Sequence, residues 1–271
     1  MPDLNSLQKA ELRLLHQFVD ICDEHHYSYI MLGGTMLGAI RHGGFIPWDD
    51  DVDMGMPRKD YECFISWMRE QEDRKELHLN YYKDQKGYIT YPAKLENLNF
   101  NVLNKSGMKT RHVGAWIDIF PLDGMPGGGL QLHLKKFRLL ALRARMQLAQ
   151  FKYVAVKYAQ RPWYEKAIMQ IARYFNPWEG ALAGHYADKI DKLLKQQDYD
   201  SSPKIVNFMG AYKFDEMFEA QIYKETDMYQ FEDLILPGVK NSDLYLTQLY
   251  GKEYMTPPAE LIKNKHMTES V

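Results

Sequence analysis

The chain has 271 residues, of which 45% are hydrophobic and 26% are charged, and its formal net charge is -2. This composition is typical of a globular protein with one large or two small domains, and it excludes a protein that binds nucleic acid through its overall charge. The two cysteines, Cys22 and Cys63, exclude a disulfide framework and a cysteine-rich zinc site.

The sequence also bears on the compartment. The N-terminus has no charged start followed by an apolar run, so we expect no signal peptide. No window approaches the ~20 apolar residues that a membrane span requires. We therefore expect a cytoplasmic protein.

The N-terminal part of the chain predicts a helix, a strand and a second helix in that order. Apolar residues recur at helical spacing through residues 4–26. A short apolar run, Tyr29 to Leu32, has strand character and is broken by Gly33-Gly34-Thr35. Met36 to Arg41 is expected to be the start of the second helix, with Thr35 as its N-cap.

A second strand is expected after a loop at residues 42–47. Asp51 to Met56 alternates charged and apolar residues, which predicts a strand with two carboxylates on one face, ended by Pro57. Later strands are predicted over residues 77–82, 88–95, 99–103 and 115–120, the last ended by Pro121. Later helices are predicted over residues 59–70, 130–175, 178–197 and 243–250, with short strands and turns over residues 204–225.

Three glycines, Gly127-Gly128-Gly129, form the best candidate linker in the chain. They divide the chain into a catalytic core (residues 1–126) and a mainly helical, basic subdomain (residues 127–203). The remaining segment (residues 204–271) is expected to pack back on the core. We find no internal repeat and no low-complexity tract.

An acidic cluster is the strongest chemical signal in the sequence. Four carboxylates fall within five residues: Asp49, Asp50, Asp51 and Asp53. They repel one another unless a cation or protons neutralise them. In an extended chain Asp49, Asp51 and Asp53 point to one side, and such a row suits Mg²⁺ or Mn²⁺, which prefer oxygen ligands. Flanking apolar residues favour a functional site over a solvated turn, and Met54 excludes an EF-hand loop, which needs glycine there.

The Gly33-Gly34-Thr35 turn lies upstream of these acids, between a predicted strand and a predicted helix. Such a turn exposes backbone N–H groups at a helix N-terminus, which suits phosphate oxygens. A Gly-Gly pair alone is weak evidence of a site, because it is usually only a turn. Combined with an Asp-x-Asp strand, it predicts that the turn binds phosphate and the acids bind the metal that neutralises it.

Cations near these motifs are further candidates for phosphate binding. Arg41 and His42 follow the glycines by about two helical turns. Lys94 lies in an apolar strand, where an unpaired lysine is costly, and is the preferred phosphate-binding lysine. Arg111 and His112 are weaker candidates.

Long stretches of the chain resemble the LicD family. Leu32 to His42, running into Gly44 to Asp53, is similar to its signature, and Ile117 to Asp123 resembles its second signature. The C-terminal end of the family resembles Tyr245-Leu246, Tyr250-Gly251, Tyr254-Met255 and Pro257-Pro258 of this chain. Residues 130 to 200 match no motif.

The resemblance implies a fold, a reaction and a set of site residues. The fold is α+β and nucleotidyltransferase-like, a mixed sheet flanked by helices. The reaction is metal-dependent transfer of phosphocholine from CDP-choline to a sugar hydroxyl of a cell-surface glycan precursor, of the teichoic acid or lipopolysaccharide type. The family pattern places metal-binding acids at Asp51 and Asp53, with Asp49 close by, and a third carboxylate at Asp118. Mg²⁺ or Mn²⁺ would stabilise the leaving CMP.

Several roles stay open from the sequence. Asp118 is either a metal ligand or the base that takes the acceptor proton, and Asp123 is expected to be a turn residue before Gly124. A choline headgroup is held by aromatic faces, and the aromatic residues nearest the motifs are Trp48, Tyr88, Tyr91 and Trp116.

Three other functions fit the same motifs. The family relatives fukutin and fukutin-related protein imply the same chemistry with another CDP-alcohol, such as ribitol or glycerol phosphate. A sugar-nucleotide glycosyltransferase also uses Asp-x-Asp, but no nucleotide-binding α/β half precedes the acids here. A catalytically inactive binding module is disfavoured because Gly33, Gly34, Asp51, Asp53 and Asp118 occur together.

The segment from Leu130 to Arg173 is strongly basic, with ten cations against one acid, Glu165. Leu132, Phe137, Leu140, Leu142, Leu148 and Phe151 give it an apolar side. A basic amphipathic helix is suited to an anionic surface, so a peripheral contact with the inner face of the cell membrane is one interpretation. A helix pair packed on the core, with its cations in water, is the other.

Overall fold

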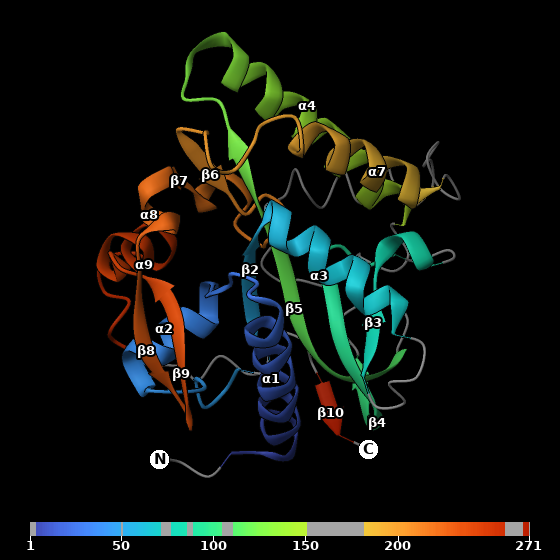
Figure 1. The fold of residues 1–271 in the computed structure, drawn as a ribbon, viewed down its shortest axis with the longest axis vertical. Helices are drawn as coiled ribbons and strands as arrows, with labels where there is room; N and C mark the ends of the chain where they lie inside the picture. Colours follow the sequence, from blue (N-terminus) through green and yellow to red (C-terminus); the bar gives the residue numbers. More distant parts are fainter. Residues whose placement is uncertain are drawn as a thin grey trace, which may run out of the picture.

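A computed structural model describes residues 4–49, 51–71, 77–85, 89–104, 111–150, 182–257 and 268–270. A mixed β-sheet lies at its centre and helices flank the sheet (Figure 1), which confirms the predicted α+β class. Among the described helices, none is long and apolar enough to cross a membrane.

The strands of the main sheet are ordered β1-β2-β5-β4-β10, with β3 beside β4 and β6 between β5 and β7. The β2–β5 pair is parallel and the other pairs are antiparallel. The strands are β1 (Ile30–Met31), β2 (Asp53–Pro57), β3 (His78–Asn80), β4 (Ala93–Asn104), β5 (Arg111–Met125), β6 (Lys204–Val206), β7 (Met217–Glu219) and β10 (Thr268–Ser270). Strands β8 (Thr226–Phe231) and β9 (Leu234–Val239) form a separate hairpin that no sequence pattern had indicated.

The helices lie close to where the sequence predicts them. They are α1 (Ser6–His25), α2 (Gly33–His42), α3 (Arg58–Glu70), α4 (Gly129–Ala149), α7 (Ala183–Leu194), α8 (Ala220–Lys224) and α9 (Ser242–Tyr250). Two 3₁₀ turns, η1 (Tyr82–Asp84) and η2 (Lys213–Glu216), complete the list. The predicted helix over residues 130–175 is confirmed as far as Ala149, and residues 151–181 lie outside the described residues.

Helix α1 forms because its start is capped and its apolar residues share one side. The Asn5 side chain accepts a hydrogen bond from Gln8 N (2.8 Å) and the Gln8 side chain accepts one from Asn5 N (3.2 Å), which is a capping box. Leu14 and Phe18 from its inner face are fully buried. The helix ends at His26, which is left-handed with φ 56°.

Strands β4 and β5 differ most from the prediction. Residues 88–95 and 99–103 were expected to be separate strands, but β4 is one strand with an irregularity between Asn97 and Val102. Strand β5 does not end before Pro121; it continues to Met125.

Pro121 is tolerated because its nitrogen faces a side of β5 that needs no donor. The Asp118 N–H donates to Val52 O at 2.8 Å, on the β2 side. Hydrogen-bonding direction alternates along a strand, so the Pro121 nitrogen points to the opposite side, where pairing with β4 stops at Ala93–Ile119. No ladder hydrogen bond is lost there.

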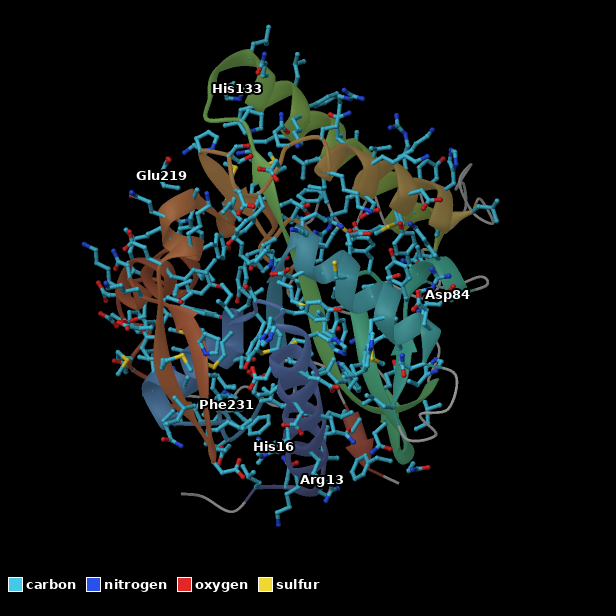
Figure 2. The ribbon with its side chains drawn as sticks, in the orientation of Figure 1. Arg13, His16, Asp84, His133, Glu219 and Phe231 are labelled. Atoms are coloured by element: carbon cyan, nitrogen blue, oxygen red, sulfur yellow. The ribbon has the colours of Figure 1, made fainter. Side chains whose placement is uncertain are left out.

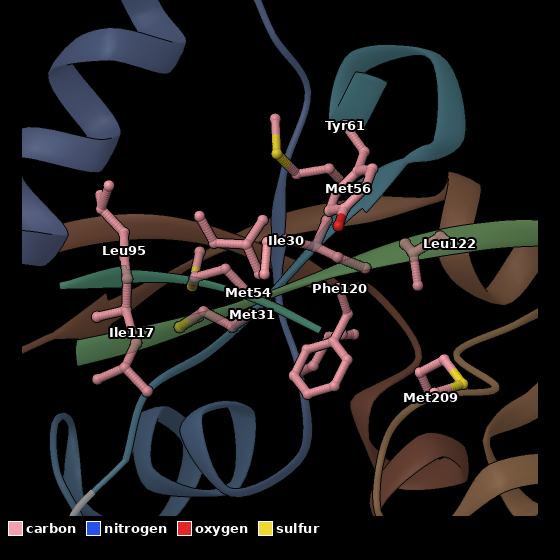
Figure 3. Close-up of a cluster of buried hydrophobic side chains, with 14 of the residues drawn as sticks. Ile30, Met31, Met54, Met56, Tyr61, Leu95, Ile117, Phe120, Leu122 and Met209 are labelled. Atoms are coloured by element: carbon pink, nitrogen blue, oxygen red, sulfur yellow. The ribbon is translucent and has the colours of Figure 1, made fainter. Parts of the chain in front are cut away.

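Most of the buried side chains of the sheet are apolar. Figure 3 shows this core, and every labelled side chain in it is buried: Ile30, Met31, Met54, Met56, Tyr61, Leu95, Ile117, Phe120, Leu122 and Met209. Helices α4 and α7 pack against each other beyond one end of the sheet (Figure 1). The boundaries predicted at residues 126 and 203 stay a prediction.

A buried ion network joins α3 and α7 to β5. Both Arg58 Nε and Nη2 lie 2.7 Å from the Asp123 carboxylate, and Arg58 Nη1 lies 2.8 Å from Asp191 Oδ1. Burial alone would lower the pKa of Arg58, but Asp123 and Asp191 raise that pKa well above its usual value, so the guanidinium stays charged. Asp123 is thus a buried partner of Arg58 within β5, and its predicted role as a turn residue is wrong.

Replacing Asp123 with alanine should destabilise the protein by about 3–5 kcal/mol, because it leaves the Arg58 charge buried without its bidentate partner. Chemical denaturation measures this directly. The matched control is Asp84→Ala, which breaks an equally short bidentate pair with Arg69 whose side chains are 43% and 48% exposed. The control should cost less than about 1 kcal/mol. Equal losses in the two variants would contradict the assignment.

Candidate active site

Helix α2 starts directly after β1, at the glycine pair. Leu32 is extended and precedes the helix, and Gly33 has a left-handed φ of 46°, which favours glycine. Thr35 is therefore inside the first turn, and its predicted role as N-cap is wrong. Its Oγ1 instead accepts a hydrogen bond from Asp53 N at 2.8 Å, which fixes the start of β2 against the helix.

The two glycines leave room for two carboxylates. A Cβ on Gly33 would lie 3.2 Å from Asp53 Oδ2, and one on Gly34 would lie 2.9 Å from Asp49 Oδ2. Both carboxylates thus lie at the N-terminus of α2, whose partial positive charge favours them. The Gly33 N–H donates to Tyr245 Oη (3.0 Å), so it is already occupied and differs from the free phosphate donor predicted from the sequence.

Strand register places two acids and a lysine in one row across the sheet. Asp53 of β2 is paired with Asp118 of β5, and Asp118 is paired with Lys94 of β4. Paired residues on neighbouring strands present their side chains on the same face. The row therefore brings Asp118 beside Asp53, as the prediction of a third carboxylate at this site requires.

Lys94 is held by this row and by an aromatic ring. Its Nζ lies 2.8 Å from Asp118 Oδ1 and 3.0 Å from Oδ2, and 4.5 Å from the centre of the Trp116 ring. The premise that Lys94 is unpaired is therefore wrong, because the register supplies its partner. Its ammonium group remains at the site, paired with Asp118.

Asp53 is the electrostatic centre of the site. Burial raises its pKa well above the usual value, and the nearby charges of Asp51, Asp118, Glu216 and Asp49 raise it further. By surface area the residue as a whole is half-buried. Asp51 precedes β2, which starts two residues later than predicted, and it still contributes to this field. Asp50 lies outside the described residues.

These residues fit a hard divalent cation. The donors are carboxylate oxygens, and the central one resists ionisation without a compensating positive charge, which is the chemistry that Mg²⁺ and Mn²⁺ complement. The described part of the chain contains no group of three acids, histidines or cysteines already arranged as a ligand set. Metal binding by Asp49, Asp51 and Asp53 stays a prediction.

Glu216 is a site residue that the sequence did not indicate. It is buried at the end of η2, where Asn207 Nδ2 donates to its Oε2 at 2.8 Å. Burial raises its pKa to about 7, against the lowering effects of Asn207, the Tyr212 backbone and Arg143. No motif surrounds residue 216, so only the fold reveals this acid near Asp53.

Two more contacts shape the site from distant segments. The Gln8 side chain of α1 donates to Asp49 O (3.0 Å) and Ile46 O (3.4 Å), which anchors the acidic loop. The Tyr250 hydroxyl would lie 3.7 Å from a Cβ on Gly33, and Tyr250 meets Tyr212 edge to face at 5.6 Å. Tyr245 and Tyr250 were part of the C-terminal resemblance, but nothing in the sequence placed them beside the glycines.

Arg41, His42 and Trp48 form an adjoining group at the end of α2. Arg41 Nε donates to His42 Nε2 (2.9 Å), and its Nη1 donates to Tyr254 O (2.8 Å). Arg41 lies 5.9 Å from the centre of the Trp48 ring, and His42 meets that ring edge to face. Burial lowers the pKa of His42, and Arg41 lowers it further, which agrees with a neutral ring accepting the hydrogen bond. Asp49 and Tyr250 act electrostatically on Arg41, so this group borders the acidic cluster.

The structure thus gathers most of the predicted residues in one place. Gly33, Gly34, Thr35, Asp49, Asp51, Asp53, Asp118 and Lys94 form one group, and Arg41, His42 and Trp48 border it. The side chains of Arg111 and His112, and all of Tyr88, lie outside the described residues. A cavity of about 920 Å³ that includes Tyr27, Lys59 and Tyr199 contains none of the predicted site residues.

Comparisons with known proteins find similar sequences along this chain. The family model for the LicD/FKTN/FKRP nucleotidyltransferase domain matches residues 26–133, which hold the glycines, the Asp cluster, Lys94 and Asp118. Lipopolysaccharide cholinephosphotransferase LicD of Haemophilus influenzae is 30% identical over 275 residues, covering 98% of this chain and 97% of that protein. Ribitol 5-phosphate transferase FKRP of Homo sapiens is 31% identical over 108 residues, covering 40% of this chain and 20% of that protein.

Asp53→Asn should stabilise the metal-free protein at neutral pH. Because the folded-state pKa of Asp53 is raised, the folded protein holds a proton that the unfolded chain has lost, and stability falls as pH rises through that window. The variant removes this loss, so its melting temperature in EDTA should exceed that of the wild type by at least about 2 °C at pH 8. The difference should shrink near pH 4.

Asp227→Asn, at an exposed position of β8, is the control and should leave the melting temperature unchanged. A metal-free Asp53→Asn protein that melts below the wild type at pH 8 would contradict a raised pKa of Asp53 in the folded protein.

Proposed function

Since this chain belongs to the LicD family, we propose that it transfers phosphocholine from CDP-choline to a sugar hydroxyl of a cell-surface glycan precursor of the teichoic acid or lipopolysaccharide type. The observation that carries the proposal is 30% identity along 98% of the chain with the lipopolysaccharide cholinephosphotransferase of Haemophilus influenzae. The glycine pair, the acids and the Lys94–Asp118 pair supply the chemistry.

In this proposal Asp51 and Asp53, with Asp49, hold Mg²⁺ or Mn²⁺. The cation, when bound, neutralises the donor pyrophosphate and the leaving CMP. The glycines contribute by letting the Asp49 and Asp53 carboxylates lie against α2. Thr35 and Gln8 contribute by fixing the backbone at Asp53 and Asp49, so the acids are positioned before the donor arrives.

Asp118 and Lys94 act beside the reacting phosphorus. The acceptor oxygen forms a new bond to the choline-bearing phosphorus, and the bond from that phosphorus to CMP breaks. Asp118, which faces Asp53 across β2 and β5, takes the acceptor proton or holds the cation. Lys94 orients the Asp118 carboxylate, and its ammonium group offers a donor to a phosphoryl oxygen.

The ring environments narrow the choice of choline-binding aromatics. Trp48 and Trp116 already face Arg41 and Lys94, and a second cation on those rings would be repelled. The Tyr212–Tyr250 pair instead lies near Asp53, where aromatic rings and negative charge occur together. We assign the headgroup to this pair and assign Arg41, His42 and Trp48 to the nucleotide part of the donor.

Ribitol phosphate transfer is the second candidate. The human ribitol 5-phosphate transferase FKRP matches 40% of this chain, and the catalytic residues required would be the same. Only the headgroup pocket would differ. In either case we place the reaction in the cytoplasm, at the inner face of the cell membrane, where the acceptor would be lipid-linked.

A panel of CDP-choline, CDP-ribitol and CDP-glycerol, assayed for CMP release with the glycan acceptor and Mg²⁺, tests the proposal. CDP-choline should be the preferred donor, and EDTA should abolish turnover until Mg²⁺ or Mn²⁺ is restored. Asp53→Asn should lower the rate by at least about 1,000-fold, because it removes a ligand and leaves the donor charge unneutralised. The exposed Asp227→Asn should keep full activity.

Preference for CDP-ribitol would replace the headgroup assignment and keep the chemistry. Full turnover in EDTA, or by Asp53→Asn, would overturn the metal-dependent mechanism.

A further inference from the structure

Helix α4 uses most of its cations to pack against the rest of the protein. It carries Lys135, Lys136, Arg138, Arg143 and Arg145 and no acid. Lys135 is buried and donates to Gly124 O, Leu194 O and the Gln197 side chain. Arg143 donates to Phe208 O and Gly210 O, and Lys136 lies 4.7 Å from the centre of the Phe214 ring.

The opposite face of α4 exposes apolar side chains. Leu130, Leu134 and Phe137 are spaced by four and three residues, so they form one stripe, and they are 73%, 53% and 71% exposed. Leu140 extends the stripe at 41% exposure. The inward face is separate and is formed by Leu132, Leu139 and Met146, which are buried. The apolar side predicted from the sequence is therefore divided between two faces, because Leu132 points inward and Phe137 and Leu140 point outward.

The two remaining cations lie beside this stripe. Arg138 and Arg145 are exposed, and they follow Leu134 and Phe137 along the same side of the helix. In Figure 1 α4 lies along the outer edge of the molecule, and Figure 2 shows His133 from its first turns at that edge. Nothing on the described part of the chain covers the outward face.

We propose that the outward face of α4 binds an anionic membrane surface, with Leu130, Leu134 and Phe137 inserted between the lipids and Arg138 and Arg145 on the headgroups. An exposed apolar stripe beside cations, with no acid on the helix, is the pattern of an interfacial helix. A soluble acidic polymer would use the arginines and leave the apolar stripe in water. The inference goes beyond the proposed function, because it concerns a surface that holds none of the site residues and applies whichever donor is used.

Co-sedimentation of the full chain with vesicles tests the proposal. The protein should pellet with phosphatidylglycerol–phosphatidylcholine vesicles at low salt, bind phosphatidylcholine vesicles weakly, and be released at high salt. Leu134→Gln/Phe137→Gln should reduce binding at least about tenfold, because it removes the inserted groups. Arg138→Gln/Arg145→Gln should reduce binding to the anionic vesicles about 30-fold, since each cation near such a surface contributes about fivefold.

Matched controls separate this face from the general surface. Met228→Gln/Ile235→Gln removes two side chains that are 60% and 61% exposed on the β8–β9 hairpin, and Lys189→Gln/Lys192→Gln removes two exposed charges from α7. Both controls should pellet like the wild type, and all variants should keep the wild-type rate of CMP release from soluble substrates.

Three outcomes would overturn the proposal. The first is a wild type that stays in the supernatant at low salt, and the second is a Leu134→Gln/Phe137→Gln variant that pellets unchanged. The third is a dimer in sedimentation velocity that this variant dissociates, which would assign the face to a second copy of the chain. Loss of donor turnover with vesicle binding intact would instead count only against the proposed function.

Discussion

Repulsion among carboxylates is the constraint on which the arrangement of the rest of the site depends. Asp49, Asp51, Asp118 and Glu216 all act on Asp53, whose pKa burial and these charges raise well above its ordinary value. A protein keeps such a cluster only if other elements hold it in place. Here α2 approaches so closely that a Cβ at residue 33 or 34 would crowd the Asp53 or Asp49 carboxylate, and the N-terminus of α2 partly offsets the negative charge.

The register of the sheet positions the other charged residues of the site. Parallel pairing of β2 with β5, and antiparallel pairing of β5 with β4, put Asp53, Asp118 and Lys94 in one row, so a single register fixes an acid pair and its counter-ion. A slip of β5 by one residue would replace Asp118 in the row with a neighbour whose side chain had faced the other way. The buried Arg58–Asp123–Asp191 network disfavours such a slip, because it joins Asp123 of β5 to α3 and α7. Stability and function therefore depend on the same strand.

The parts predictable from sequence were those set by neighbouring residues. The glycines, the acids and the helix that follows the glycines lie within residues 33–53, where turn chemistry and alternation act locally, and the structure brings them together as predicted. Contacts between distant segments were not predictable. Glu216, Gln8 and Tyr245 reach the site through tertiary packing. No local pattern marks Glu216 or Gln8, and the family resemblance included Tyr245 without placing it beside the glycines. Predicting the pairing of Lys94 with Asp118 required knowledge of the strand register. Predicting the length of β5 required knowing that the side of the strand faced by the Pro121 nitrogen is unpaired there. The two faces of α4 likewise became distinct only once its inward partners were known.

The central claim is that the absence of a side chain at Gly34 lets a cluster of mutually repelling carboxylates bind a divalent cation. Calorimetric titration of Mn²⁺ into the protein, in two buffers of different ionisation enthalpy, measures both affinity and protons released. The account predicts that Mn²⁺ displaces protons and binds more tightly as pH rises, because Asp53 must ionise. It also predicts that Gly34→Ala weakens binding at least about tenfold, since its Cβ would lie 2.9 Å from Asp49 Oδ2. Gly184→Ala, where a Cβ meets nothing within 4 Å, should bind Mn²⁺ like the wild type. Mn²⁺ binding without proton release, and with equal affinity in Gly34→Ala, would contradict the account.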